Sequence, residues 1–265
     1  MKSPRIKSEQ RDENGKLLAR LQMDPEGRLD GVSIFYDPET GHALQKLSYR
    51  AGELDGSTRM YDPETGKLVQ RARFKAGELD GMFVAYEKGR PAVRSMYGSG
   101  KLDGPMQTFE KGRQTGYFTF VNGVQEGPSR WYDDAGRMIK IINYKAGQPE
   151  GEAFEYHKNT RLREKAFYKS GERSGEQLQY YENGALAEKA EFEADQPAHV
   201  QRFYEDGVLM EESHFKAGKP QGEAMKYHPT GKRREREIFK DGEPQGEPER
   251  FDRKGRKIKP KQKKS

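Results

Sequence analysis

The sequence lacks cysteine and has few hydrophobic residues, and both absences limit what the chain can be. Without cysteine there is no disulfide, no thiol nucleophile and no thiolate metal ligand. Hydrophobic residues make up only 32% of the chain, and no run approaches the ~18 apolar residues of a transmembrane helix. The first residues are charged and contain no apolar core of a signal peptide. We therefore expect a cytoplasmic location for the chain as written, and a periplasmic one if a leader has been removed.

The chain also lacks a large excess of charge of one sign, whereas aromatic residues and glycine are plentiful. The 49 basic and 43 acidic residues leave a net charge of +6, and there are 14 tyrosines, 13 phenylalanines and 30 glycines. Disordered polar chains have few aromatic residues and a high net charge. The composition therefore indicates an ordered chain with a thin core.

A repeat of about 24 residues runs through the chain. The segment Gly-Glu-Leu-Asp-Gly occurs at 52–56 and again at 77–81, and its last glycine serves as an anchor for the repeat. The anchors are Gly31, Gly56, Gly81, Gly104, Gly127, Gly151, Gly175, His199, Gly222 and Gly246. An aromatic residue follows most anchors by five positions and gives the row Tyr36, Tyr61, Tyr86, Phe109, Tyr132, Tyr156, Tyr180, Tyr204 and Tyr227. A second aromatic row, which includes Tyr49 and Phe74, precedes the next anchors.

Each repeat reads as a β-hairpin, because two short alternating runs are separated by glycine-containing turns. One hairpin cannot bury its aromatic side chains alone, so neighbouring hairpins must stack. The predicted fold is all-β: an elongated, open antiparallel β-meander of stacked hairpin repeats. We expect an N-terminal extension at 1–14, the repeat array at 15–252 and a basic tail at 253–265. The open terminal strands leave a homo-oligomer as an alternative.

The pattern Gly-x-x-x-x-Tyr-x-x-x-Gly-x-Leu, followed by Tyr/Phe-Lys-x-Gly-x-x-x-Gly, resembles the MORN repeat in its bacterial variant form. Clean copies lie at 180–186 and 215–222. Chains built of such repeats are similar to an antitoxin or immunity-protein family. That resemblance implies a protein that binds and neutralises a cognate toxin or secreted effector, including one that degrades membrane lipids. Other MORN proteins are scaffolds, so a peripheral membrane or protein-assembly scaffold that binds anionic phospholipid is the alternative.

No constellation of residues predicts catalysis, a cofactor or a metal site. The histidines show none of the spacings of zinc hydrolases, and there is no Gly-x-Ser-x-Gly motif. Acidic residues just before several anchors are expected to stabilise turns rather than bind a cation. We therefore expect a protein that is not an enzyme, with no catalytic residues, no cofactor and no metal.

Basic charge is concentrated near the C-terminus. Residues 253–264 contain eight lysines or arginines and no acidic residue, which leaves the repeats nearly neutral. We expect weak contact of this tail with anionic lipid, and the neutral repeats argue against a nucleic-acid partner.

The position before each tyrosine of the first row predicts a partner surface. Alternate residues of a strand share a face, so we expect the tyrosines to mark the packed face and the preceding residues to point away from it. Exposed aromatic and arginine residues are typical of binding hot spots. The predicted partner-binding residues are Phe35, Met60, Arg130, Trp131, Tyr132, Arg202, Phe203 and Tyr204. Local packing beneath a neighbouring loop is the alternative for these side chains.

Overall fold

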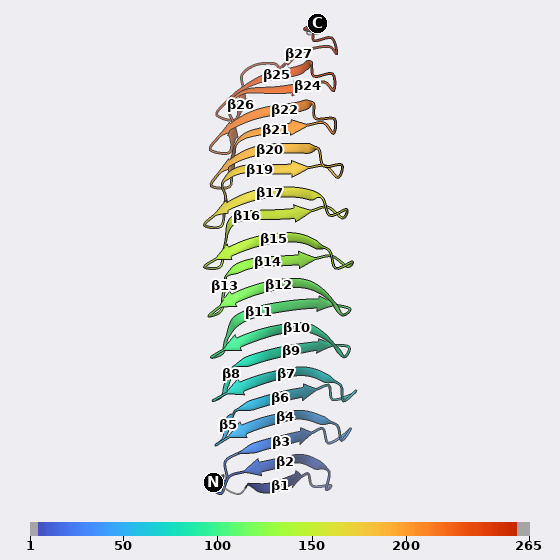
Figure 1. Ribbon diagram of the computed structural model, residues 1–265, viewed down its shortest axis with the longest axis vertical. Helices are drawn as coiled ribbons and strands as arrows, with labels where there is room; N and C mark the ends of the chain where they lie inside the picture. The colour runs from blue at the N-terminus through green and yellow to red at the C-terminus, as the bar shows by residue number, and fades with distance from the viewer. Residues whose placement is uncertain (1–4, 259–265) are drawn as a thin grey trace, which may run out of the picture. The chain divides into compact units, whose positions relative to one another are not determined.

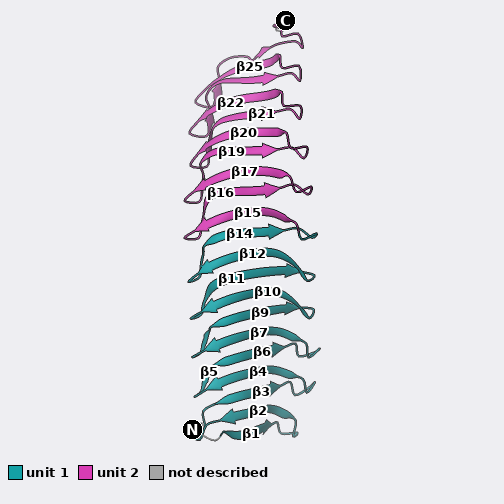
Figure 2. Ribbon diagram, viewed as in Figure 1, with its two compact units in different colours: residues 1–136 teal, residues 137–265 magenta. Residues whose placement is uncertain are grey.

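The computed structural model describes residues 5–258, which form 27 β-strands and no helix. The chain divides into two compact units, unit 1 at 1–136 and unit 2 at 137–265 (Figure 2). Within the described range, no helix is long and apolar enough to cross a membrane. The prediction of an all-β antiparallel meander is confirmed in each unit.

The strands of unit 1 alternate in direction along the chain (Figure 1). Their bounds are β1 (Ile6–Arg11), β2 (Leu17–Met23), β3 (Gly31–Tyr36), β4 (Ala43–Arg50), β5 (Glu53–Leu54), β6 (Gly56–Tyr61), β7 (Leu68–Lys75), β8 (Glu78–Leu79), β9 (Gly81–Glu87), β10 (Arg90–Gly98), β11 (Lys101–Glu110), β12 (Arg113–Val121), β13 (Val124–Gln125) and β14 (Gly127–Tyr132). Each long strand pairs antiparallel with the next long strand, and the short strands β5, β8 and β13 pair with the ends of β4, β7 and β12.

Unit 2 repeats this arrangement. Its strands are β15 (Met138–Lys145), β16 (Gln148–Tyr156), β17 (Leu162–Lys169), β18 (Glu172–Arg173), β19 (Gly175–Tyr180), β20 (Leu186–Glu193), β21 (Gln196–Phe203), β22 (Leu209–Lys216), β23 (Lys219–Pro220), β24 (Gly222–Tyr227), β25 (Arg233–Lys240), β26 (Glu243–Pro244) and β27 (Glu249–Arg250). The short strands β18, β23 and β26 pair with the ends of β17, β22 and β25.

The sheet includes part of the predicted N-terminal extension, because β1 lies within 1–14 and pairs with β2 along its whole length. At the other end of the chain, Phe251 and Lys257 form an antiparallel bridge. Within the described part of the predicted tail, Arg256 forms an ion pair with Asp252 at 2.8 Å. Residues 259–265 of that tail lie outside the described residues.

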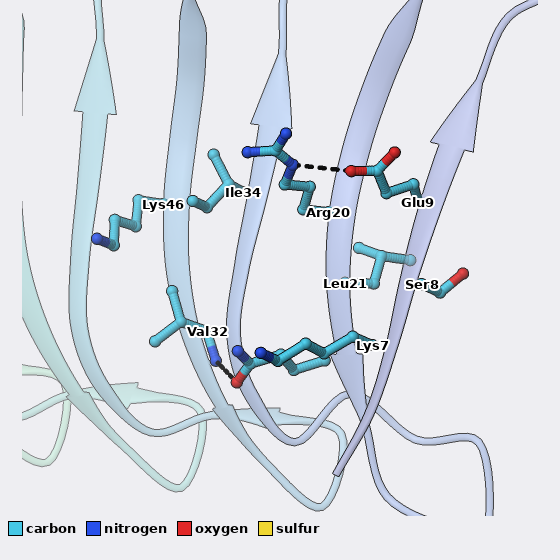
Figure 3. A pocket seen from close by; sticks show the side chains of 9 residues that line it. Lys7, Ser8, Glu9, Arg20, Leu21, Val32, Ile34 and Lys46 are labelled. Carbon is cyan, nitrogen blue, oxygen red and sulfur yellow. Dashed lines mark hydrogen bonds and ion pairs between the residues drawn. The ribbon is translucent and has the colours of Figure 1, made fainter.

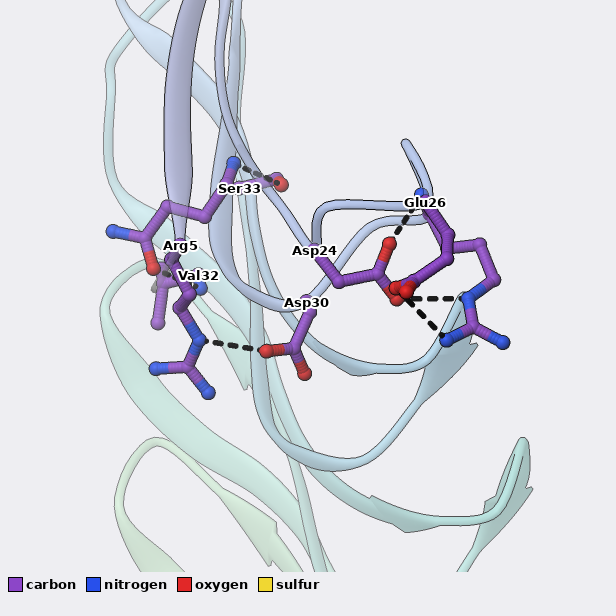
Figure 4. A network of polar contacts seen from close by, with 8 residues as sticks. Arg5, Asp24, Glu26, Asp30, Val32 and Ser33 are labelled. Carbon is purple, nitrogen blue, oxygen red and sulfur yellow. Dashed lines mark hydrogen bonds and ion pairs between the residues drawn. The ribbon is translucent and has the colours of Figure 1, made fainter. Parts of the chain in front are cut away.

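Two kinds of turn connect the strands. At one end of the repeats, two-residue turns place both residues at positive φ, as at Ala51 (49°) and Gly52 (92°), which matches the right-handed twist of a hairpin. The Gly52 amide then donates to Leu29 O of the preceding repeat at 2.8 Å. At the other end, an aspartate caps its own turn, as where Asp37 Oδ1 accepts the amide of Thr40 at 2.8 Å. The turn at 24–30, at the same end as Gly52, is also capped by an aspartate, because Asp24 Oδ1 accepts the amide of Arg28 at 2.8 Å (Figure 4). Backbone hydrogen bonds thus join repeats whatever their strand side chains are.

The two aromatic rows lie on opposite faces of the sheet. Tyr49 is paired with Gly31 and shares the face of the buried Ser33. Tyr36 lies instead under the Arg20 guanidinium, 5.8 Å from the ring centroid, on the other face. The expectation that the tyrosine row marks the packed face is therefore wrong. Residues of the first row follow a β-bulge, as between Phe35 and Tyr36, and the most buried side chains lie on the face of Phe35.

The repeat at 198–204 is shifted by one residue relative to the predicted alignment. The bulge of β21 falls between Arg202 and Phe203, and Phe203 pairs with Leu209 as Tyr180 pairs with Leu186. Phe203 therefore occupies the first aromatic row, and Tyr204 lies in the turn. The alignment failed because this repeat has no anchor glycine to fix its register.

Candidate partner-binding surfaces of unit 1

One face of unit 1 carries no formal charge along two rows of paired residues, and we call it the uncharged face. Its outer row runs across the strands through Gln10, Ala19, Phe35, Gln45, Met60, Gln70, Ala85, Val93, Thr108, Gly116 and Trp131. Its inner row runs through Ser8, Leu21, Ser33, Leu47, Thr58, Ala72, Phe83, Ser95, Met106, Phe118 and Ser129. Because 35% of all residues in the chain are charged, such a face is a distinct feature of unit 1.

Small side chains lie among larger apolar ones in the inner row. Ser33 and Ser129 are fully buried, at 0% exposure, and Thr58 is 3% exposed. Their hydroxyl groups are hydrogen-bonded, as where Gln125 Nε2 donates to Ser129 Oγ at 2.7 Å. The inner row is therefore the structural core of unit 1, and the half-exposed outer row is what this face offers to a partner.

Trp131 lies at the end of the outer row and packs against the inner row. Its ring meets Phe118 edge to face, with centroids 5.5 Å apart and an interplanar angle of 80°. Opposite Trp131 lies Gly116, where an added Cβ would come within 2.5 Å of the Phe118 ring and 2.6 Å of Thr108 Oγ1. The missing side chain at Gly116 is thus what leaves room for Phe118 beside the Trp131 ring.

The opposite face of unit 1 is basic. A row of paired residues, which we call the arginine row, crosses it through Arg20, Ile34, Lys46, Arg59, Arg71, Val84, Arg94, Gln107, Tyr117 and Arg130. Like charges directly opposite one another destabilise a sheet, yet Lys46 faces Arg59, and Arg59 faces Arg71. Among the described residues, these three cations form no ion pair.

A shallow cavity of about 530 Å³ lies at the β1 end of the arginine row. Figure 3 shows Val32 and Ile34 on its floor, between the side chains of Lys7 and Lys46. The Arg20 guanidinium at its rim is bound by Glu9 at 3.0 Å, and hydrogen bonds from Arg11 and Arg20 lower the pKa of the Glu9 carboxyl. Two cations beside an apolar floor suit an anionic group that carries an apolar side chain.

Three of the predicted partner-binding residues share one surface. Phe35, Met60 and Trp131 all belong to the outer row of the uncharged face and are half-buried. Arg130 points to the opposite face, where its guanidinium lies 5.7 Å from the Tyr117 ring centroid. Tyr132 is half-buried in the first aromatic row. The triplet 130–132 therefore contributes to two faces rather than to one patch.

The predicted triplet 202–204 belongs to unit 2 and is engaged in local contacts. Arg202 is bound by Glu188 at 2.8 Å and by Glu211 at 3.2 Å. Phe203 is half-buried after the bulge, and the Tyr204 hydroxyl donates to Tyr227 O at 2.9 Å. These residues stabilise unit 2 in the described structure, and their proposed partner contact stays a prediction.

Sequence reasoning missed the arginine row. Net charge hides the row, because acidic residues in turns, such as Asp37 and Asp62, offset cations that lie on strands. A signal was present in the alternation of Arg71, Ala72 and Arg73, which assigns both arginines to the face opposite the buried alanine. Residue parity within each strand, rather than net charge, would have found the row.

Comparison with known proteins identifies the repeats. Residues 125–146, 173–194 and 198–217 match the family described as "MORN repeat variant". Each of the last two segments covers one hairpin of unit 2, β19 with β20 and β21 with β22. The chain therefore contains MORN-variant repeats, as the resemblance implied. No curated protein matches the sequence.

Solved structures similar to the chain include three that contain TcdB2 and TccC3. The match to "Crystal Structure of TcdB2-TccC3-Cdc42" has 14% identity and a TM-score of 0.22, and covers 93% of this chain and 14% of that one. The match to "Crystal Structure of TcdB2-TccC3-TEV" has 16% identity and a TM-score of 0.20, and covers 91% and 15%. The match to the same assembly without its hypervariable C-terminal region has 13% identity and a TM-score of 0.22, and covers 96% and 16%. The chain thus spans about a sixth of these proteins or less, and the TM-scores are too low to indicate a shared fold.

Proposed function

We propose that the chain is a non-catalytic binding protein that acts as an antitoxin or immunity protein: it binds a cognate toxin or secreted effector and covers the surface that the toxin needs for its activity. The observation that carries this proposal is the uncharged face of unit 1. Phe35, Met60 and Trp131 lie half-exposed along its outer row, in a chain otherwise rich in charge. Large apolar patches with aromatic anchors are typical of protein-binding surfaces.

The repeat architecture supports the same proposal. Stacked repeats present an extended surface whose residues vary from one repeat to the next, while the backbone contacts between repeats are kept. The outer row varies in this way, with Phe35, Met60, Ala85, Thr108 and Trp131 at equivalent positions. A rigid face of this kind binds without reordering, which lowers the entropic cost of association.

The test is capture of the partner by the full chain, followed by titration. We expect one protein to bind in stoichiometric amount, and its toxicity to be relieved when the two are expressed together. Met60→Glu places a charge on the uncharged face, and Trp131→Ala removes an anchor; each is expected to weaken binding by about 2 kcal/mol. Gln179→Ala is the matched control, because Gln179 occupies the equivalent strand position in unit 2. Equal affinity of all four chains, or a partner without toxicity, would contradict the proposal.

A second candidate function, a peripheral scaffold on anionic phospholipid, is supported by the arginine row. Each basic residue near an anionic surface adds about 1 kcal/mol of attraction. Lys46, Arg59 and Arg71 are adjacent and have no acidic partner within residues 5–258. Co-sedimentation with phosphatidylserine vesicles at moderate salt tests this candidate. The scaffold function predicts binding by the full chain and a loss in Arg59→Gln/Arg71→Gln, whereas the antitoxin function predicts no vesicle binding.

A further inference from the structure

Strands β21 and β22 bring two histidines and a glutamate together on one face of unit 2. His199 and His214 are directly opposite one another, and Gln201 and Glu212 form the next pair on the same face. The two imidazole rings are stacked, with centroids 4.5 Å apart and an interplanar angle of 11°. Ligand atoms of His199, Glu212 and His214 all lie within 4.8 Å of one another. We propose that these three side chains form a binding site for a divalent transition-metal ion of the Zn²⁺ type.

The hydrogen bonds of the cluster orient its ligand atoms. His214 Nδ1 lies 3.3 Å from Glu223 O, and because a carbonyl oxygen only accepts, Nδ1 carries the proton and Nε2 keeps its lone pair for a metal. Metal-bound histidines commonly hold their second nitrogen in this way. Glu212 Oε1 lies 2.9 Å from His199 Nε2 and accepts a hydrogen bond from Gln201 Nε2 at 2.9 Å. A carboxylate oxygen is thus already held beside one imidazole nitrogen.

Small side-chain movements are enough to form the site. Ligand atoms around a tetrahedral Zn²⁺ ion lie about 3.3 Å apart, given bonds of about 2.0–2.2 Å. The 2.9 Å contact between His199 and Glu212 has to widen by about 0.4 Å, and the longest separation has to close by about 1.5 Å. His214 is exposed, so that its ring can shift without displacing buried side chains. Three protein ligands leave a fourth position open toward solvent, where water or a partner's side chain can bind.

The charges around the cluster favour a cation. Glu191 lies directly opposite His199 on β20. Glu223, which belongs to β24 on the other side, is itself bound by Arg236. The nearest lysine on β20, Lys189, is already bound by Glu176 at 2.6 Å. Two imidazole nitrogens and one carboxylate are typical of zinc, nickel or copper sites, whereas magnesium and calcium prefer oxygen ligands. This site goes beyond the proposed function and does not depend on it.

The test is metal binding by the full chain without a histidine tag, measured by calorimetric titration with ZnCl2 and by the visible absorption of bound Co²⁺. We expect one saturable Zn²⁺ site per chain, no binding of Mg²⁺ at the same concentration, and a rise in the unfolding midpoint with Zn²⁺. His214→Asn and Glu212→Gln are each expected to lower Zn²⁺ affinity at least tenfold. His42→Asn is the control, because His42 belongs to unit 1 and is not a member of this cluster.

Two outcomes would overturn the metal site. One is the absence of saturable Zn²⁺ or Co²⁺ binding by the unaltered chain. The other is an affinity that falls less than tenfold in His214→Asn or in Glu212→Gln, or falls equally in His42→Asn. Far-UV circular dichroism of each variant checks that the sheet is retained. We expect both variants to fold, because His214 is exposed and glutamine has the same size as glutamate.

Discussion

Units 1 and 2 have the same repeat but distribute charge differently. In unit 2, the row equivalent to the uncharged outer row of unit 1 is charged at almost every position, through Lys140, Glu155, Glu164, Gln179, Glu188, Arg202, Glu211, Lys226, Glu235 and Arg250. Its charges are paired, as where Lys226 binds Glu235 at 2.9 Å and Arg202 binds Glu188. The same strand positions therefore form an apolar surface in unit 1 and a network of ion pairs in unit 2.

The opposite face differs in one repeated position. Lys165 of unit 2 is bound by Glu152 at 2.7 Å, and Lys189 by Glu176 at 2.6 Å. These glutamates directly follow the anchor glycine, and the hydrogen bonds that the lysines donate to them raise the pKa of both lysines. In unit 1 the residue after the anchor is Val32, Ser57, Met82, Pro105 or Pro128. Among the described residues, lack of an acid at this position leaves Lys46, Arg59 and Arg71 without an ion pair, whereas Arg20 of the same row is bound by Glu9.

The turns that follow the first aromatic row differ as well. In unit 1, Asp37 and Asp62 cap their own turns through side-chain oxygens. In unit 2, the equivalent residues reach the next repeat: Tyr181 and Tyr204 donate to backbone carbonyls there, as do the histidines His157 and His228. The backbone contacts and the aromatic rows maintain the array in both units, so that the side chains on the strand faces are free to differ.

The largest expected effect on stability comes from adding a side chain to the closely packed part of the uncharged face. Gly116→Ala forces Phe118 away from Trp131, because the new Cβ would lie within 2.5 Å of the Phe118 ring. We expect a loss of about 2 kcal/mol in the free energy of unfolding, as for overpacked cores. Urea unfolding followed by Trp131 fluorescence measures it. Gln70→Ala, at the equivalent position, should change stability by less than about 0.5 kcal/mol; an unchanged midpoint in Gly116→Ala would show that the face is loosely packed.

A smaller effect is expected from the contacts between repeats in unit 2. Tyr204→Phe removes the hydrogen bond to Tyr227 O and should cost about 1 kcal/mol of unfolding free energy. Thermal unfolding of the full chain measures the loss. Tyr61→Phe in unit 1 is the control, since no hydrogen bond of the Tyr61 hydroxyl occurs among the described residues. If the unfolding temperature falls equally in both variants, the Tyr204 hydrogen bond does not contribute to the difference between the units.

Sequence reasoning predicted the hairpins because turn glycines and aromatic rows recur in register. It placed Phe35, Met60 and Trp131 on one face correctly, since alternation along a strand fixes the face. It failed where local signals end. Alternation along a strand does not tell which of the two faces is packed, and the most buried side chains lie on the face of Phe35 rather than on that of Tyr36. The missing anchor glycine shifts Phe203 by one position. The pairing of His199 with His214 is not visible without the register between strands.

Ionisation of Glu164 gives a pH-dependent difference between the units. Burial, and the Glu155 carboxylate opposite it, raise the pKa of Glu164 above its ordinary value of 4.5. Its ionisation therefore costs stability as pH rises through the folded pKa, and no cost exists at low pH, where it is neutral in both states. Glu164→Gln should raise the free energy of unfolding at pH 7 and leave it unchanged at pH 4. The gain at pH 7 is limited to about 1 kcal/mol, because solvent screens a half-exposed group. A gain that is equal at both pH values would show that charge is not its cause.

The smallest expected effect converts the arginine row toward the pattern of unit 2. Ser57 follows the anchor Gly56 and lies opposite Arg73. Arg71 lies two residues before Arg73, on the same face of β7. Ser57→Glu provides the acid that unit 2 has at this position, and an exposed ion pair of this kind adds about 0.5 kcal/mol. Chemical denaturation with urea at low and high salt measures the gain, which should vanish at high salt because exposed pairs are screened. Ser57→Gln matches the side-chain length without the charge. If both variants gain equally, the missing acid is not what distinguishes the two basic rows; if only Ser57→Glu gains, one residue per repeat decides whether this face carries free cations.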